Sequence, residues 1–185
     1  MTAPEIIAAL AQPGAEAAES ADGMPTIVVA REHLVEVSRG LRESPALGFS
    51  FLADITCTDY HPREPRFEVI YLLACLGVTG FGDTPKRLRM KVRLPGADVK
   101  VPSVSSVWPA AGWAERELYD LFGVIVTDHP DLRRILMPED WEGYPLRKDY
   151  PVQIKQAVRL SHPLQVSEEQ FVANIQAARD RVRKD

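Results

Sequence analysis

The chain has 185 residues, 26% of them charged, and a formal net charge of −4, so one domain with its own hydrophobic core is the simplest organisation. This charge gives no reason to expect nucleic-acid binding, which favours basic surfaces. The two cysteines, Cys57 and Cys75, are too few for the four thiolates that an iron–sulfur cluster normally takes. No apolar run approaches the roughly 20 residues of a membrane helix, so we expect membrane association only through partners.

The first 24 residues are expected to form a flexible N-terminal segment. Residues 3–11 are compatible with a short helix, whereas residues 12–23 have the Pro, Gly and Ala content of a loose linker. The segment carries glutamates and lacks a basic region, so we expect neither a signal peptide nor a transit peptide. The ordered domain should therefore begin near Pro25.

The next three elements follow from hydrophobic pattern and length. Residues 26–30 read TIVVA, which is typical of a short strand. Residues 31–43 place apolar side chains among charges at helical spacing, and residues 52–59 have the composition of a second strand. The order is therefore strand, helix, strand.

Two further strands have clearer patterns. Residues 67–76 read FEVIYLLACL and are apolar on both alternating faces after Glu68, which predicts a central strand covered on both sides. Residues 86–94 read KRLRMKVRL, with apolar and basic side chains in strict alternation. Its apolar face should pack on helices, while its basic face is either solvated or covered by acidic groups.

These elements predict an α+β fold in two layers, with a mixed β-sheet of about four or five strands and helices on one face. Residues 25–123 should form this domain. The chain then continues as an extended strap over residues 124–152 and as a C-terminal tail over residues 153–185. Near the end, Ser167 is a favourable N-cap for a terminal helix spanning about residues 168–182.

A helix is also expected from about Trp113, ending at Gly123, and its charges invite a search for an active site. Helical geometry sets Glu115 and Glu117 on opposite sides of the apolar stripe, so they do not converge as an acid–base pair would. A solvated charged face explains both glutamates. Asp120 is different, because an anion in the last turn opposes the helix dipole, and we expect a partner to compensate it.

The segment 124–152 contains prolines that keep it out of helical conformations and few apolar residues at regular spacing. It is instead rich in residue types that dominate protein interfaces. These residues are Arg133, Arg134, Trp141, Tyr144, Arg147 and Tyr150. The strap could contact another protein or pack over the domain's own sheet, and both can hold.

Other candidate sites have weaker support. Residues 77–82 read G-x-x-G-x-G, but a strand follows instead of the helix that a phosphate-binding loop requires, so a hairpin connection is expected. The histidines have no metal-ligand spacing, and three of the four precede proline in expected loops. They are His33, His61, His129 and His162. We therefore predict no metal site and no nucleic-acid site.

Residues 108–152 carry a set of short motifs in one block. These are ERE at 115–117, DLFG at 120–123, HPDLRR at 129–134, PEDWEG at 138–143 and PLRKDYP at 145–151. In order and spacing they resemble the signature of the C subunit of the proton-pumping NADH:quinone oxidoreductase, respiratory complex I of the bacterial type. The strand and helix pattern from 25 to 94 also looks like this family, so the resemblance covers about residues 25–152.

The resemblance implies a non-catalytic structural and assembly subunit in the hydrophilic arm of the complex, which couples electron transfer from NADH through Fe–S clusters to quinone with proton translocation. It implies no catalytic, cofactor-binding or metal-binding residue in this chain, with the Fe–S clusters and FMN held by partner subunits. The implied partners are the B, D and I subunits, at the cytoplasmic side of the cell inner membrane. The signature residues implied at subunit interfaces are Glu115, Arg116, Glu117, Asp120, His129, Arg133, Arg134, Trp141, Arg147, Lys148, Asp149 and Tyr150.

The sequence leaves two alternatives open. Related membrane-bound hydrogenases and other quinone-reducing complexes share this signature, so an equivalent subunit of such a complex is the nearest alternative. A hypothesis of another class is a free-standing hydrolase that uses Glu115, Glu117 and His129. It requires these three side chains to converge on an accessible surface.

Overall fold

The computed structural model describes residues 1–77, 85–151, 167, 169–173, 175 and 176. The chain divides into two compact units, Met1–Tyr150 and Pro151–Asp185, which are described separately. Among the described residues, no helix has the length and hydrophobicity needed to cross a membrane.

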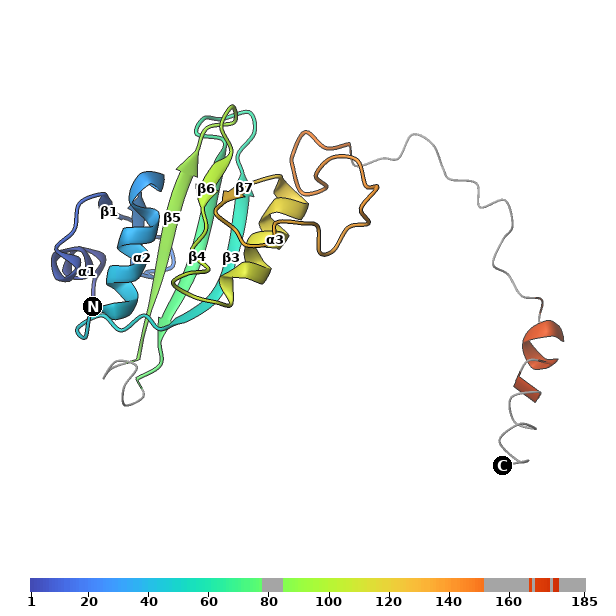
Figure 1. Ribbon diagram of the computed structural model, residues 1–185, viewed down its shortest axis with the longest axis horizontal. Coiled ribbons are helices and arrows are strands. Elements are labelled where there is room, and N and C mark those ends of the chain that lie inside the picture. Colours follow the sequence, from blue (N-terminus) through green and yellow to red (C-terminus); the bar gives the residue numbers. More distant parts are fainter. Residues whose placement is uncertain (78–84, 152–166, 168, 174, 177–185) are drawn as a thin grey trace. The chain divides into compact units, whose positions relative to one another are not determined.

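A mixed five-stranded sheet forms the centre of the first unit (Figure 1), in the order β1-β2-β5-β4-β3. Its strands are β1 (Ala15–Ala18), β2 (Thr26–Val29), β3 (Phe51–Asp59), β4 (Phe67–Cys75) and β5 (Lys86–Leu94). β2 is parallel to β5, and the other neighbours are antiparallel. A short parallel pair, β6 (Lys100–Pro102) and β7 (Ile125–Thr127), lies outside this sheet.

Helices cover one face of the sheet, as predicted. They are α1 (Ala3–Leu10), α2 (Leu34–Glu43), which follows the 3₁₀ turn η1 (Arg31–His33), and α3 (Ala111–Phe122). In α2 the side chains of Leu34, Val37 and Leu41 repeat at helical spacing and are fully buried. They join one hydrophobic core with the apolar residues on the covered face of the sheet. The two-layer α+β prediction is therefore confirmed.

The N-terminal residues are part of this domain, so the prediction of a flexible segment before Pro25 is wrong. The predicted helix is present as α1, and its Ile6 and Leu10 side chains lie in the core. The expected linker contains β1, whose Ala15 pairs with Val29 of β2. Alanine and glutamate favour strands little, so local sequence gave no signal for β1, and pairing with β2 stabilises it.

β4 lies inside the sheet between β5 and β3, as expected of a central strand, but the coverage of its two faces differs from expectation. β5 occupies the middle, and β4 is covered by helices on one face only: Tyr71 is fully buried, whereas Ile70 and Leu72 on the other face are half-buried. The prediction that residues 67–76 are covered on both faces is therefore confirmed for one face. The described residues leave the other face only half-buried. The basic face of β5 was expected to be either solvated or covered by acidic groups, and it is partly paired with acidic groups.

The remaining predictions concern the strap, the Gly-rich loop and the tail. The strap begins with β7 and continues from Asp128 to Tyr150 in turns without helix or strand, as part of the first unit. Antiparallel pairing of β4 with β5 agrees with the expected hairpin connection, although residues 78–84 lie outside the described residues.

In the second unit, the Gln170 backbone N–H donates to the Ser167 hydroxyl, so Ser167 is an N-cap as predicted. Residues 169–173, 175 and 176 are helical. Residues 152–166 and the end of the predicted terminal helix, over residues 177–182, lie outside the described residues.

Candidate functional site

Helix α3 is the anchor on which the strap is built. Ala111, Leu118 and Phe122 are buried against the core, which holds the helix in place. It ends at Gly123, whose φ of 69° lies in the left-handed region that favours glycine. A Cβ atom at Gly123 would lie 2.4 Å from Cε2 of Tyr144. The strap therefore packs directly against the end of the helix.

Asp120 is fully buried and binds the strap. Its Oδ2 accepts hydrogen bonds from the backbone N–H groups of Ile135, Leu136 and Met137 at 3.0, 2.7 and 2.8 Å. Its Oδ1 accepts one from the Arg134 guanidinium at 2.7 Å. Burial alone would raise the pKa of Asp120, but these donors together lower it to about 2. The partner expected for this anion is thus supplied by the same chain.

The arginines at positions 116 and 134 also tie helix to strap. Arg116 donates to the carbonyl oxygens of Arg133 and Arg134, so it faces the strap and not Asp120. Arg134 in turn donates to the carbonyl oxygens of Trp141 and Gly143. Each guanidinium therefore donates hydrogen bonds to backbone carbonyl groups of the strap beyond β7, where there is no helix or strand in which those groups could be paired.

Arg147 closes the C-terminal end of α3. Its Nε donates to the carbonyl oxygen of Phe122 at 2.6 Å, and its guanidinium lies 4.6 Å from the ring centroid of Tyr144 and 5.3 Å from that of Phe67. A cation at the C-terminus of a helix satisfies unpaired carbonyl groups and interacts favourably with the helix dipole. This contact connects the strap, the helix and strand β4.

A second carboxylate anchors the strap at the end of β3. Asp59 is buried and accepts two hydrogen bonds from Arg66, one from the His61 backbone N–H and one from that of Lys148. Burial opposes ionisation, but these donors lower the pKa of Asp59 well below its usual range. Arg66 also pairs with Asp149 at 2.8 Å. The signature residues near 148 are thereby fixed to the sheet.

Glu115 lies near the other end of α3 and is only 1% exposed. Its carboxylate accepts hydrogen bonds from the Ser103 hydroxyl and the Val104 backbone N–H, each at 2.7 Å. The Nε2 atom of His129 is 3.8 Å away and lies 3.0 Å from the Gly112 carbonyl oxygen. Burial raises the pKa of Glu115, and its hydrogen bonds and His129 oppose this only in part. The expectation that Glu115 lies on a solvated face is wrong.

The other predicted site residues are more exposed or pack within the strap. Glu117 is exposed, so it diverges from Glu115 as the helical geometry predicted. Arg133 is exposed and forms a surface ion pair with Asp131. Trp141 stacks on Tyr150 with ring centroids 6.5 Å apart. The structure therefore brings most signature side chains together around α3 and leaves Glu117 apart.

Several large apolar side chains of α3 and the strap are exposed among charged ones, and sequence reasoning did not single them out. Trp113 on the helix is 66% exposed, and Leu136 and Leu146 in the strap are 60% and 48% exposed. Ile135, next to Leu136, is 36% exposed. We call these four residues the apolar ridge. Charged residues dominate the motifs of this segment, so the sequence pattern gave no signal for these outward-facing apolar side chains.

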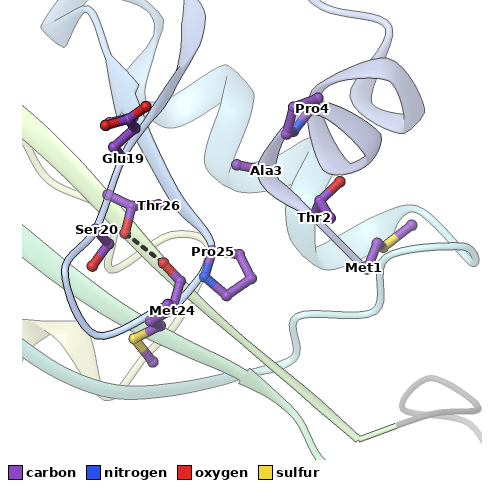
Figure 2. Close-up of a pocket in the computed structure, with 11 residues that line it drawn as sticks. Met1, Thr2, Ala3, Pro4, Glu19, Ser20, Met24, Pro25 and Thr26 are labelled. Carbon is purple, nitrogen blue, oxygen red and sulfur yellow. Dashed lines mark hydrogen bonds between the residues drawn. The ribbon is translucent and has the colours of Figure 1, made fainter.

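We searched the described residues for a metal site and for an acid–base pair in a pocket. They contain no group of three or more His, Cys, Asp or Glu side chains that could hold a metal ion. A pocket between the start of α1 and the β1–β2 connection (Figure 2) is lined by one carboxylate, Glu19, and by no histidine, cysteine, lysine or arginine side chain. Thr26 there donates to the carbonyl oxygen of Met24. No acid–base pair lines this pocket.

Comparison with known proteins decides the family. Residues 27–156 match the family described as the respiratory-chain NADH dehydrogenase 30 Kd subunit. The chain belongs to this family. The C subunit of NADH-quinone oxidoreductase from Geobacter sulfurreducens is 48% identical over 132 residues, which cover 71% of this chain and 76% of the relative. The C subunit of NADH-quinone oxidoreductase from a Roseiflexus species is 46% identical over 127 residues, which cover 69% of this chain and 70% of the relative.

Two solved structures share the fold of this chain. A trypsin-resistant fragment of Nqo5 is 34% identical, with a TM-score of 0.59 over 71% of this chain and all of the fragment. A chain of an archaeal membrane-bound sulfane sulfur reductase has a TM-score of 0.69 at 23% identity, over 89% of this chain and 96% of that chain. At this identity the match shows the fold alone. The family match includes all signature residues from Glu115 to Tyr150 but begins after α1 and β1.

Proposed function

We propose that this chain is a non-catalytic structural subunit in the hydrophilic arm of an NADH-quinone oxidoreductase. Its relatives bear the name of the C subunit of that complex. The observation that carries the proposal is the internal pairing of the signature charges. Each of these charged side chains on α3 or the strap forms a hydrogen bond with the other segment, so together they fix a surface and do not form a reactive site. They are Arg116, Asp120, Arg134 and Arg147.

That surface suits contact with another protein. The apolar ridge stands on a strap that α3 and β3 hold at several points, so little conformational entropy remains to be lost on binding. Exposed aromatic and aliphatic side chains on a fixed scaffold are the usual anchors of an interface. Arg133, which is exposed beside the ridge, adds a positive charge at its edge.

We propose that the redox cofactors, Fe–S clusters and FMN, are held by partner subunits. Cys57 is buried, and burial raises the pKa of its thiol to about 12, which disfavours the thiolate that binds metals. Cys75 is also buried. Two cysteines in a whole chain do not make the four-thiolate set of a cluster.

The partners we propose are the B, D and I subunits of the same complex. Contact with them would hold the chain at the cytoplasmic side of the inner membrane as a peripheral subunit, with no direct membrane contact. The exposed large apolar side chains on the helix and the strap support a protein partner, because their burial in an interface is favourable.

The test is purification of the complex through an affinity tag on this chain. The B and D subunits should co-purify, while the isolated chain should neither oxidise NADH nor reduce quinone. Arg133→Glu should reduce the recovery of both partners, whereas Arg39→Glu, the same charge reversal on an exposed position of α2, should not. Equal recovery with the two variants, or turnover by the isolated chain, would contradict the proposal.

The competing functions make different predictions. An equivalent subunit of a related membrane-bound complex would have hydrogenase-type genes beside its own gene instead of those for the NADH module. A hydrolase would need reachable groups, but the side chains of Glu115 and His129 are only 1% and 2% exposed, and Glu117 points elsewhere. The geometry therefore favours the structural subunit.

A further inference from the structure

The sheet has a second face that no described helix covers. On β4 the side chains of Ile70, Leu72 and Ala74 point to this face, because they alternate with the buried core residues. Phe51 of β3 pairs with Ala74, so it lies on the same face, and it is 48% exposed. The water-facing side of an antiparallel sheet is normally polar, so this apolar band is unusual for a solvated surface.

A basic band runs beside the apolar one. β5 lies next to β4 (Figure 1), and the register sets Arg87 opposite Ala74, Arg89 opposite Leu72 and Lys91 opposite Ile70. Arg93 continues the series. Paired residues on neighbouring strands point to the same side, so the two bands form one continuous surface. We call it the open face.

The positive charges of the open face are only partly neutralised within the described chain. Lys91 and Arg93 share one carboxylate, that of Glu68, at 2.7 and 3.4 Å. Arg89 pairs with Asp22 at 2.6 Å. Arg87 is exposed and has no acidic partner among the described residues. An excess of positive charge therefore remains along β5, which complements carboxylates on a partner.

We propose that the open face docks an amphipathic helix of a neighbouring subunit, with an apolar stripe over β4 and carboxylates over β5. This inference rests on the proposed function. A helix is roughly 10 Å wide with its side chains and neighbouring strands are roughly 4.8 Å apart, so one helix spans two strands. The apolar stripe covers Ile70, Leu72 and Ala74, and the carboxylate edge pairs with Arg87. The open face is distinct from the apolar ridge on α3 and the strap.

The first test is cross-linking in the assembled complex. The photoreactive residue p-benzoylphenylalanine replaces Phe51, which keeps the aromatic ring, and in a matched sample replaces Arg39 on α2. The Phe51 position should cross-link to an acidic helical peptide of another subunit, identified by mass spectrometry, and the Arg39 position should not. A cross-link only to lipid, only to residues beyond Tyr150 of this chain, or to nothing would overturn the proposal.

The second test uses charge reversal. Arg87→Glu should reduce recovery of the subunit cross-linked from Phe51 by about tenfold, because a like charge would face its carboxylates. Arg39→Glu should leave recovery unchanged, and the melting temperatures of both variants show that they fold. Unchanged recovery with Arg87→Glu would overturn the docking proposal. Failure of the unmodified chain to co-purify with any other component of the complex would instead overturn the proposed function.

Discussion

Two buried carboxylates on one helix have opposite pKa shifts. Asp120, near the C-terminal end of α3, accepts hydrogen bonds from three backbone N–H groups and a guanidinium, and its pKa falls to about 2. Glu115, nearer the start, accepts two hydrogen bonds from neutral groups, and burial raises its pKa. Both side chains are at most 1% exposed, but Glu115 lies deeper in the protein, so the depth of burial together with the number and charge of the donors sets the direction of each pKa shift.

This difference has a structural consequence. The Asp120 anion orders a segment without helix or strand, because it is the shared acceptor for consecutive backbone groups of the strap. Glu115 fixes only the short turn after β6 to the helix. We therefore expect strap order to depend strongly on Asp120 and weakly on Glu115.

The largest effect is expected for Asp120→Asn. The amide loses the charge that faces Arg134 and leaves a mostly buried guanidinium without its anion, so unfolding should become easier by about 3–5 kcal/mol. Urea unfolding of the isolated chain measures this. Glu117→Gln, on an exposed position of the same helix, should change stability by less than about 0.5 kcal/mol. An equal loss of unfolding free energy in the two variants would show that Asp120 stabilises the fold no more than an exposed acidic residue does.

The next effect concerns the contact between helix end and strap. Gly123→Ala places a Cβ at a φ of 69° and 2.4 Å from the ring of Tyr144, so it should cost about 2–3 kcal/mol and make the strap more sensitive to trypsin. Gly23→Ala is the matched control, because Gly23 has a φ of 70° but nothing within 4 Å of the added Cβ. Equal losses in the two variants would show that backbone strain alone is responsible.

The smallest effect is expected for Glu115→Gln, and its sign depends on pH. The folded pKa of Glu115 is raised, so its contribution to stability is complete below the unfolded pKa of about 4.3 and is lost as the pH rises through the folded value. The variant should lie within about 1 kcal/mol of the unmodified chain at pH 7 and gain relative stability as the pH rises. Unfolding measured from pH 4 to 8 tests this.

Asp120 should have the opposite pH dependence. Its folded pKa of about 2 lies below the unfolded value of about 3.9, so its contribution is complete above pH 4 and is lost as the pH falls through 2. The stability difference between the unmodified chain and Asp120→Asn should therefore shrink in acid. The same pH slope at both positions would contradict the assignment of opposite shifts.

Local sequence was sufficient for the elements with a strong period. The alternation of residues 86–94 and the helical spacing of Leu34, Val37 and Leu41 each have one geometry that buries the apolar side chains, and the structure has β5 and α2 there. Gly123 likewise marked the end of α3. The motifs from 115 to 151 were sufficient for the family, which the match over residues 27–156 confirms.

Tertiary structure decided what those residues contact. β1 has little strand propensity and exists through pairing with β2, and Glu115 is buried because Ser103 and Val104, distant in sequence, reach it. The sequence determined that Asp120 needs a compensating charge, since an anion at a helix C-terminus is unfavourable by itself. Only the folded chain decided that Arg134 supplies it, because long-range hydrogen bonds depend on how the strap returns to α3 and not on any local pattern.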